Sequence, residues 1–171
     1  MARLFAAQSV DIVGASMVKR IKGEVDFSAV QKQLAGIRTE VGYLPGKEYP
    51  DGTPVAYIAA IHEYGSPSNG IPPRPTLHPS LDQTRGKLSN ILIGGIRSAI
   101  GGGSVDAAFE AVGLAAQGIV RGAIADLKSP ALSDATVKRR ASRHHAGKAS
   151  NKPLVDSGTM LDSVEYSVVR G

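Results

Sequence analysis

The pattern of apolar positions predicts two long helices in the second half of the chain. From Pro79 or Ser80 onward, apolar residues keep the 3.6-residue period of a helix as far as the glycines at 101–103. A second periodic run follows, with Ser104 as a candidate N-cap and Asp106 in the first turn, where the helix dipole favours a carboxylate. Its apolar seam comprises Val105, Phe109, Val112, Ala116, Ile119, Ala123 and Leu127. We expect the two helices to pack as a hairpin across the glycine turn, with the glycine pair at 94–95 interrupting the first.

Shorter elements flank this pair. A helix is predicted from Asp26 or Ser28 to about Gly36, and alternation over residues 39–44 predicts a strand. Residues 55–64 predict a short helix, with Pro54 in its first turn and Gly65 as its C-cap. The prolines of residues 66–75 exclude regular structure there. Further on, the sequence predicts short helices at 132–143 (capped by Ser133) and 156–162, and a closing strand at 164–168 that pairs with 39–44.

These elements predict a single α+β domain with extended loops, in which a small antiparallel sheet packs against long α-helices. We place this domain at residues 28–171. Residues 1–27 form an N-terminal segment to which the sequence assigns no secure structure. Apolar residues between 12 and 21 recur at helical spacing, but Gly14 and Gly23 weaken a helix there.

Composition narrows the class of protein. The 171 residues are 42% hydrophobic, as in a globular chain, and the absence of cysteine excludes disulfides and thiolate chemistry. The beginning of the chain lacks the pattern of a signal peptide. No uninterrupted apolar run reaches the ~20 residues of a membrane helix, so we expect a soluble protein made in a cytoplasm. Aromatic residues make up only 5% of the chain and tryptophan is absent, which favours an oligomer whose neighbours complete the burial.

The net charge of +5 is concentrated in one segment. Residues 128–152 contain seven lysines and arginines but a single acidic residue, Asp134. Such a segment is either a solvated loop or a surface for nucleic acid or an acidic protein. The residues expected to form this basic surface are Lys138, Arg139, Arg140, Arg143, Lys148 and Lys152.

No catalytic or metal-binding pattern stands out. His62, Glu63 and His78 form a cluster of polar residues but lack the two-histidine spacing of a zinc protease helix. The glycines at 101–103 are not followed by the Lys-Ser/Thr of a phosphate-binding loop, and Ser157 lies in no nucleophile elbow. We therefore expect a protein that is not an enzyme and that holds neither metal nor cofactor. Glu63 is instead expected to form a bidentate pair with Arg74 that locks the proline-rich loop.

Residues 49–82 resemble the neck or tail-completion proteins of long-tailed bacteriophages. That family carries a turn, a "VAxIAxxxExG" helix and an "IPPRPFxRPxxD" segment before a long helix. The matching residues are Pro50, Asp51, Gly52, Thr53, Val55, Ala56, Ile58, Ala59, Glu63, Gly65, Ile71, Pro72, Pro73, Arg74, Pro75, Pro79 and Asp82. The segments 130–136 and 152–164 resemble its "PPLSPxT" and "KPLIDTGxLLxSI" motifs, so that the likeness covers roughly residues 38–169 in order. This chain departs from the pattern at Thr76, where the family often has an aromatic residue, and at His78, where it often has arginine.

The resemblance implies a structural virion protein: a ring-forming subunit, expected as a hexamer, between the head connector and the tail tube. It implies contacts with neighbouring copies, with head-connector and tail-tube or terminator proteins, and non-specific contact with DNA in the channel, but none with a membrane. Assembly would take place in the host cytoplasm and the mature location would be the virion. The residues expected at loop and ring contacts are Glu63, Ile71, Pro72, Pro73, Arg74, Pro75 and His78.

Two alternatives come from other classes. A nucleic-acid-binding module would use the basic segment 128–152, although aromatic residues for stacking on bases are few. A hydrolase would have only scattered histidines and aspartates in its support.

Overall fold

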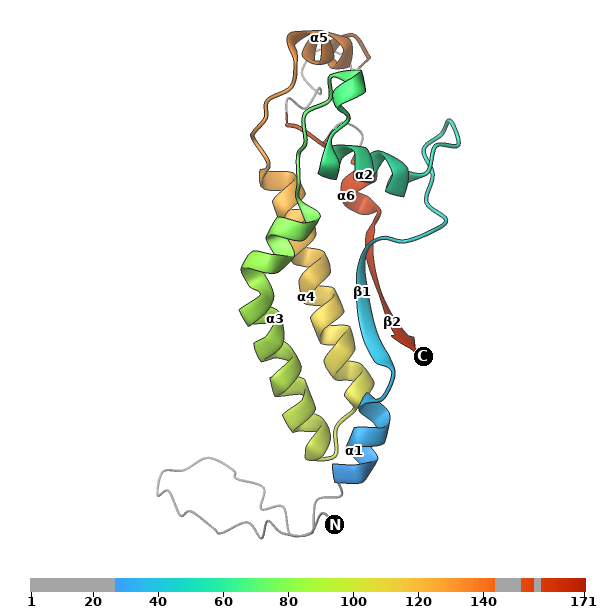
Figure 1. Ribbon diagram of the computed structural model, residues 1–171, viewed down its shortest axis with the longest axis vertical. Coiled ribbons are helices and arrows are strands. Elements are labelled where there is room, and N and C mark those ends of the chain that lie inside the picture. Colours follow the sequence, from blue (N-terminus) through green and yellow to red (C-terminus); the bar gives the residue numbers. More distant parts are fainter. Residues whose placement is uncertain (1–26, 144–151, 156–157) are drawn as a thin grey trace.

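The computed structural model describes residues 27–143, 152–155 and 158–171, and it shows an elongated molecule (Figure 1). The helix predicted within residues 12–21 lies outside this part of the chain. The elements in order are α1 (Phe27–Leu34), β1 (Ile37–Tyr43), α2 (Val55–Tyr64), the 3-10 turn η1 (Pro67–Asn69), α3 (Leu77–Ile100), α4 (Val105–Asp126), α5 (Asp134–Arg143), α6 (Thr159–Asp162) and β2 (Val164–Arg170). The predicted α+β class is confirmed, and α2 has its predicted limits. The proline-rich loop was predicted to lack regular structure, but η1 occupies three of its residues.

Helices α3 and α4 form the long hairpin that runs down the molecule (Figure 1). Ser104 caps α4 as predicted, since its Oγ accepts a hydrogen bond from the Ala107 N–H at 3.3 Å. The predicted interruption at residues 94–95 is wrong, because α3 continues to Ile100. A Cβ added at Gly95 would overlap Ala108 of α4, so this glycine lets the two helices approach closely.

A two-stranded antiparallel sheet covers another face of α4. The pairing runs from Ile37 opposite Arg170 to Tyr43 opposite Val164, which confirms the predicted partnership of the two strands. The sheet and the helix also meet closely, because a Cβ at Gly113 would overlap the ring of Tyr166. Helix α4 is therefore the central element, packed against α3 and against both strands.

The burial of α4 differs from the predicted seam. Its most buried positions are Val105, Ala108, Gly113, Ala116, Val120 and Ile124, of which only two belong to that seam. A seam along one face is expected for a helix with one neighbour, whereas α4 buries two faces. By length and composition alone, α4 is also the one helix of the described residues apolar enough to cross a membrane, although Glu110, Gln117 and Arg121 interrupt its apolar run. In this fold it packs between α3 and the sheet.

The hydrophobic core has two parts. The larger cluster gathers where the second half of α4 meets α2 and α6, and it consists of Val55, Ala59, Val120, Ile124, Leu154, Met160 and Val164. A smaller cluster, of Ile37, Ala99 and Val105, lies at the other end of the hairpin. The larger cluster anchors α2 and thereby the loop that follows it.

Candidate functional site

Glu63, in the last turn of α2, caps the beginning of α3. Its Oε2 accepts hydrogen bonds from the backbone N–H groups of Thr76 at 2.8 Å and Leu77 at 3.1 Å. Its Oε1 accepts one from the His78 N–H at 3.0 Å and lies 3.0 Å from His78 Nδ1. Three backbone donors at the beginning of a helix are thus satisfied by a residue from another element. This explains why α3 begins at Leu77, before the predicted start at Pro79 or Ser80.

The ionisation of Glu63 fits this role. Its side chain is only 10% exposed, and burial alone would raise the pKa of the carboxyl group. The hydrogen bonds from Thr76, His78 and Leu77 outweigh burial, so the pKa of Glu63 lies below its ordinary value. The carboxylate is therefore charged near neutral pH, where the dipole of α3 stabilises it further.

The proline-rich loop, residues 66–75, folds back onto the end of α2. Gly65 has φ of +77°, a conformation that favours glycine, and a Cβ there would lie 2.9 Å from Pro73 N. Within the loop, Ser66 and Ile71 exchange two backbone hydrogen bonds of 2.9 and 3.0 Å. At the far end, the Arg74 N–H donates to the His62 carbonyl at 2.6 Å. The path of the loop is thus fixed at both ends.

Arg74 connects this loop to the segment that precedes α5. Its Nε donates to the Pro130 carbonyl and its Nη2 to the Ala131 carbonyl, each at 3.0 Å, and the residue is only 7% exposed. The predicted Glu63–Arg74 pair is therefore wrong. The two side chains serve different backbone segments: the carboxylate binds free N–H groups of α3, and the guanidinium binds free carbonyls 56 and 57 residues further along.

Arg140 plays a similar part on α5. Its Nη1 donates to the carbonyls of Lys152 at 2.9 Å and Val155 at 3.2 Å. Because Arg140 is only 7% exposed, its predicted place on a basic surface is wrong. Lys138, Arg139 and Lys152 are exposed, whereas the side chain of Arg143 and all of Lys148 lie outside the described residues. We name the bonds of Glu63, Arg74 and Arg140 to the backbone, together with the loop at 66–75, the clasp.

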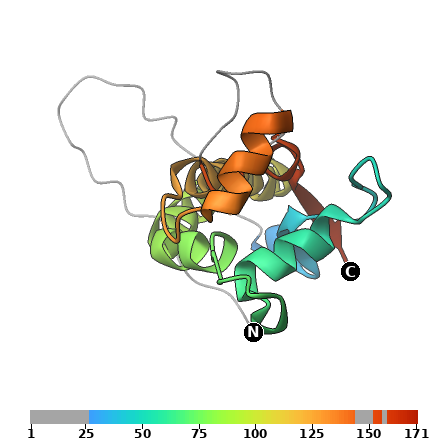
Figure 2. The ribbon, with the colours of Figure 1, turned by 90° about the horizontal axis from the view of Figure 1, so that it is seen from above.

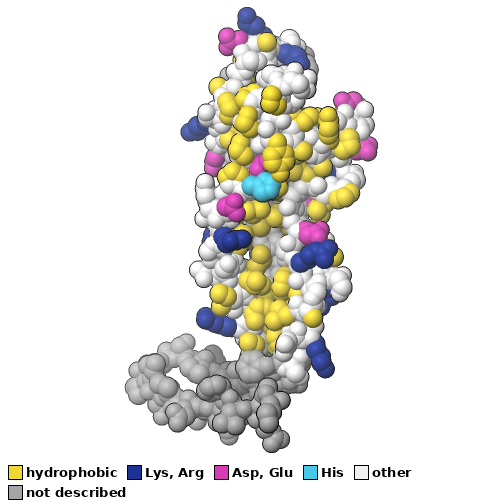
Figure 3. Space-filling model, viewed as in Figure 1, with side chains coloured by type: hydrophobic (Ala, Val, Ile, Leu, Met, Phe, Trp, Pro, Cys, Tyr) yellow, Lys and Arg dark blue, Asp and Glu magenta, His cyan; other side chains and the backbone are white. Residues whose placement is uncertain are grey.

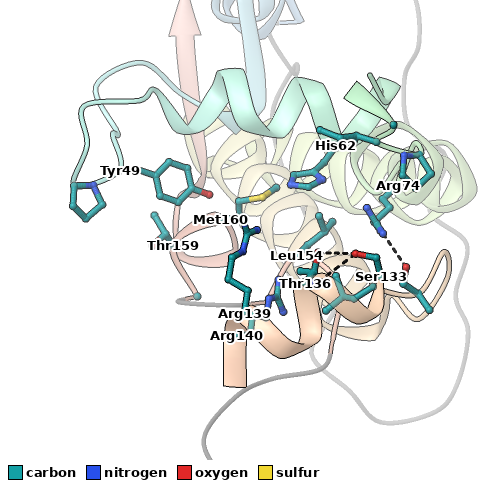
Figure 4. Close-up of a pocket in the computed structure, with 17 residues that line it drawn as sticks. Tyr49, His62, Arg74, Ser133, Thr136, Arg139, Arg140, Leu154, Thr159 and Met160 are labelled. Atoms are coloured by element: carbon teal, nitrogen blue, oxygen red, sulfur yellow. Dashed lines mark hydrogen bonds between the residues drawn. The ribbon is translucent and has the colours of Figure 1, made fainter. Parts of the chain in front are cut away.

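A cavity of about 930 Å³ opens between α2 and the loop on one side and α5 and α6 on the other. Figure 2 shows α5 crossing this end of the molecule, and Figure 4 shows the side chains that line the cavity. The cationic or titratable nitrogen groups that line it are His62, Arg74, Arg139 and Arg140. Its remaining lining is Tyr49, Pro50, Gly70, Ile71, Pro72, Ala131, Leu132, Ser133, Thr136, Leu154, Gly158, Thr159 and Met160. Over the described residues, therefore, no aspartate or glutamate lines the cavity.

His62 extends from α2 into this cavity (Figure 4). Its Nδ1 is buried and, within the described part of the chain, has no hydrogen-bond partner. Burial lowers the pKa of His62, and the neighbouring charges of Arg74 and Arg140 lower it further. The imidazole is therefore neutral at pH 7.

A second hollow, of about 300 Å³, lies below α2 between β1 and the beginning of α3; we name it the groove. It is lined by Val41, Gly42, Tyr43, Leu44, Ala56, Ala59, Ala60, His62, Glu63, Tyr64, Thr76, Leu77, His78 and Met160. Tyr64 is 69% exposed, and its ring lies 6.1 Å from that of His78. Figure 3 shows hydrophobic side chains gathered along the middle of this face of the molecule.

The predicted contact residues fall into separate places. Glu63 and Arg74 hold backbone within the chain, Ile71 and Pro72 line the cavity, and His78 lies at the groove. Pro73 and Pro75 are exposed. No local signal predicts that His62 and Met160 share a cavity with α5, because nearly a hundred residues separate them and no motif links them. Across the described residues, no group of three His, Cys, Asp or Glu side chains could hold a metal ion.

No family model, curated protein or solved structure matches the chain. The resemblance to phage neck proteins therefore stays a prediction, and the function must be argued from the clasp, the cavity and the groove.

Proposed function

We propose that the protein is a structural virion protein of a tailed bacteriophage, a ring-forming neck or tail-completion subunit that joins the head connector to the tail tube. The ordered motifs described above support this assignment. As such a subunit, the protein acts by assembling with its neighbours and not by catalysing a reaction.

The observation that carries the proposal is the clasp. The charged residues of the central motif hold backbone: Glu63 binds α3, and Arg74 binds the segment before α5. Pro72, Pro73 and Pro75 remain exposed on the loop that these bonds fix in place. A preformed loop loses little conformational entropy when it docks, which suits a contact repeated identically around a ring.

The groove and the sheet offer surfaces for that contact. Tyr57 and Tyr64 of α2 are 61% and 69% exposed, an uncommon position for large aromatic side chains in a chain so poor in them. In the described sheet, each strand has one neighbour only and so keeps one unpaired edge. A head-to-tail contact that joins one copy's groove to a different surface of the next would close a ring. We place Tyr64 at this contact.

Light scattering on the purified protein tests the groove contact. We expect the wild type to form a discrete oligomer and Tyr64→Glu to lower its mass, since a carboxylate in an apolar contact is costly. Tyr57→Glu is the matched control, because Tyr57 is similarly exposed on the same helix but does not line the groove. Equal masses for wild type and Tyr64→Glu would show that the groove does not take part in the contact between copies.

The exposed basic residues of α5 keep a nucleic-acid-binding module as the second candidate. Lys138 and Arg139 are exposed there, but the burial of Arg140 removes one charge from the expected surface. Tight binding to duplex DNA with a steep loss of affinity as salt increases would favour this candidate over the ring subunit.

A further inference from the structure

We propose that the cavity between α2, α5 and α6 is a binding site for a carboxylate group carried by a polypeptide, either an acidic side chain or a C-terminal carboxylate. This inference does not depend on the role of the protein in a virion.

The wall of the cavity carries positive charge. Arg74 is almost fully buried, yet the groups it binds are carbonyl oxygens, which orient the guanidinium without neutralising it. A buried cation without a counter-charge is costly, and a bound anion would relieve that cost. The described lining of the cavity contains no carboxylate of its own.

The cavity also has nitrogen atoms with hydrogen-bonding capacity that the described residues do not use. The two bonds of Arg74 to carbonyls use Nε and Nη2, and no described residue accepts a hydrogen bond from its Nη1. His62 adds a buried Nδ1 without a partner, and its ring extends into the cavity beside Arg74 (Figure 4). An imidazole that gains a proton there could donate to a carboxylate together with the guanidinium.

The rest of the cavity wall indicates the kind of anion that fits. Apolar side chains make up much of the remaining wall, among them Ile71, Pro72, Leu154 and Met160. These side chains suit the aliphatic stem of a glutamate or the residues that flank a terminal carboxylate. The recessed position of Arg74 excludes the backbone of a duplex, which is wide and would need cations at the surface. The chemistry thus favours a peptide carboxylate over a nucleic-acid phosphate.

The experiment follows the imidazole resonances of His62 by NMR while a short, end-blocked peptide of glutamates is added to the full chain. Binding should be saturable and should raise the pKa of His62, since a carboxylate would offset the charges of Arg74 and Arg140, which lower it, in a cavity that Arg139 also lines. The same peptide with glutamine in place of glutamate should leave these resonances unchanged. A third peptide, the glutamine peptide with a free C-terminal carboxylate, distinguishes the two sources of the carboxylate. A response to this peptide indicates a site for a chain terminus, whereas a response to the end-blocked glutamate peptide alone indicates a site for an acidic side chain.

Two matched variants test the site without disturbing the clasp. Arg139→Gln should weaken binding by about threefold to fivefold, the upper part of the range for a solvent-exposed ion pair. Lys138→Gln removes the same charge from the neighbouring position of α5, which does not line the cavity, and should leave the affinity almost unchanged. Both residues are exposed, so both variants should unfold at the wild-type temperature.

Several results would overturn the proposal. They are the absence of a saturable response at millimolar peptide, an equal response to the neutral peptide, and equal losses in the two variants. Stronger binding of inorganic phosphate or of duplex DNA than of the acidic peptide at this site would also reject a carboxylate site.

Discussion

Two regions of the molecule are held together by partly different physical means. The body, which comprises α3, α4 and the sheet, depends on close apolar packing, with Gly95 against Ala108 and Gly113 against Tyr166. The clasp end, which comprises α2, the loop at 66–75, α5 and α6, contains the larger apolar cluster but depends in addition on charged side chains that bind backbone groups. Substitutions of small residues should therefore damage the body, whereas loss of charge should damage the clasp end. The two regions therefore differ in which substitutions lower the free energy of unfolding.

The largest effect is expected for Gly113→Ala in the body. The added Cβ would overlap the ring of Tyr166, which the fold holds against α4, so the free energy of unfolding should fall by about 2–3 kcal/mol. Chemical denaturation measures this loss. Gly118→Ala, at an open position of the same helix, should instead raise stability by up to about 1 kcal/mol through helix propensity. If both variants were equally stable, the close contact of α4 with the sheet would be wrong.

A second pair of variants tests the packing of the hairpin. Gly95→Ala would place its Cβ into Ala108 and should cost about 2 kcal/mol, whereas Gly94→Ala meets open space and should stabilise α3 slightly. Thermal unfolding of the two adjacent variants gives the comparison directly. A stabilising Gly95→Ala would show that α3 and α4 lie further apart than described.

In the clasp end, Arg74→Met should cost about 2 kcal/mol, because the fold loses two hydrogen bonds from a charged, buried donor to the carbonyls of Pro130 and Ala131. The damage should be local: amide hydrogen exchange should accelerate in α5 and stay unchanged in α4. Arg85→Met, at an exposed position on α3, is the control and should change neither. Faster exchange throughout α4 in Arg74→Met would mean that the two regions are not separate.

The smallest effect is expected for Glu63→Gln, at about 1 kcal/mol, the usual size of a helix cap. It should also change the response to acid. Because the pKa of Glu63 is lowered in the fold, the unfolded chain binds more protons, so the carboxylate stabilises the fold above the ordinary glutamate pKa of about 4.3. This contribution disappears as the pH falls through the lowered value. Stability measured from neutral to acid pH should therefore decline less in Glu63→Gln than in the wild type, while Glu110→Gln, exposed on α4, should follow the wild type.

The body was the more predictable region. The two long helices, the glycine turn between them and the Ser104 cap follow from local signals and were predicted correctly, although the buried face of α4 is not the predicted seam. The prediction failed where a second neighbour mattered. A glycine at position 95 weakens an isolated helix, but beside Ala108 it permits close packing.

The clasp end was predictable in its elements but not in its bonds. The limits of α2 and the cap of α5 by Ser133 follow from local signals. The partners of Arg74 do not, because they are backbone carbonyls 56 and 57 residues away, and any carbonyl carries the same chemistry. The sequence prediction pairs Arg74 with Glu63, which requires only that the loop fold back, whereas the fold presents that carboxylate with the free N–H groups of α3. The cavity could not be anticipated for the same reason.

Electron microscopy of the purified protein, alone and with duplex DNA at physiological salt, tests the proposed function most directly. The proposal predicts closed rings with six-fold symmetry that form without DNA. Single copies that bind along DNA and form no ring would contradict it and would favour the nucleic-acid-binding module.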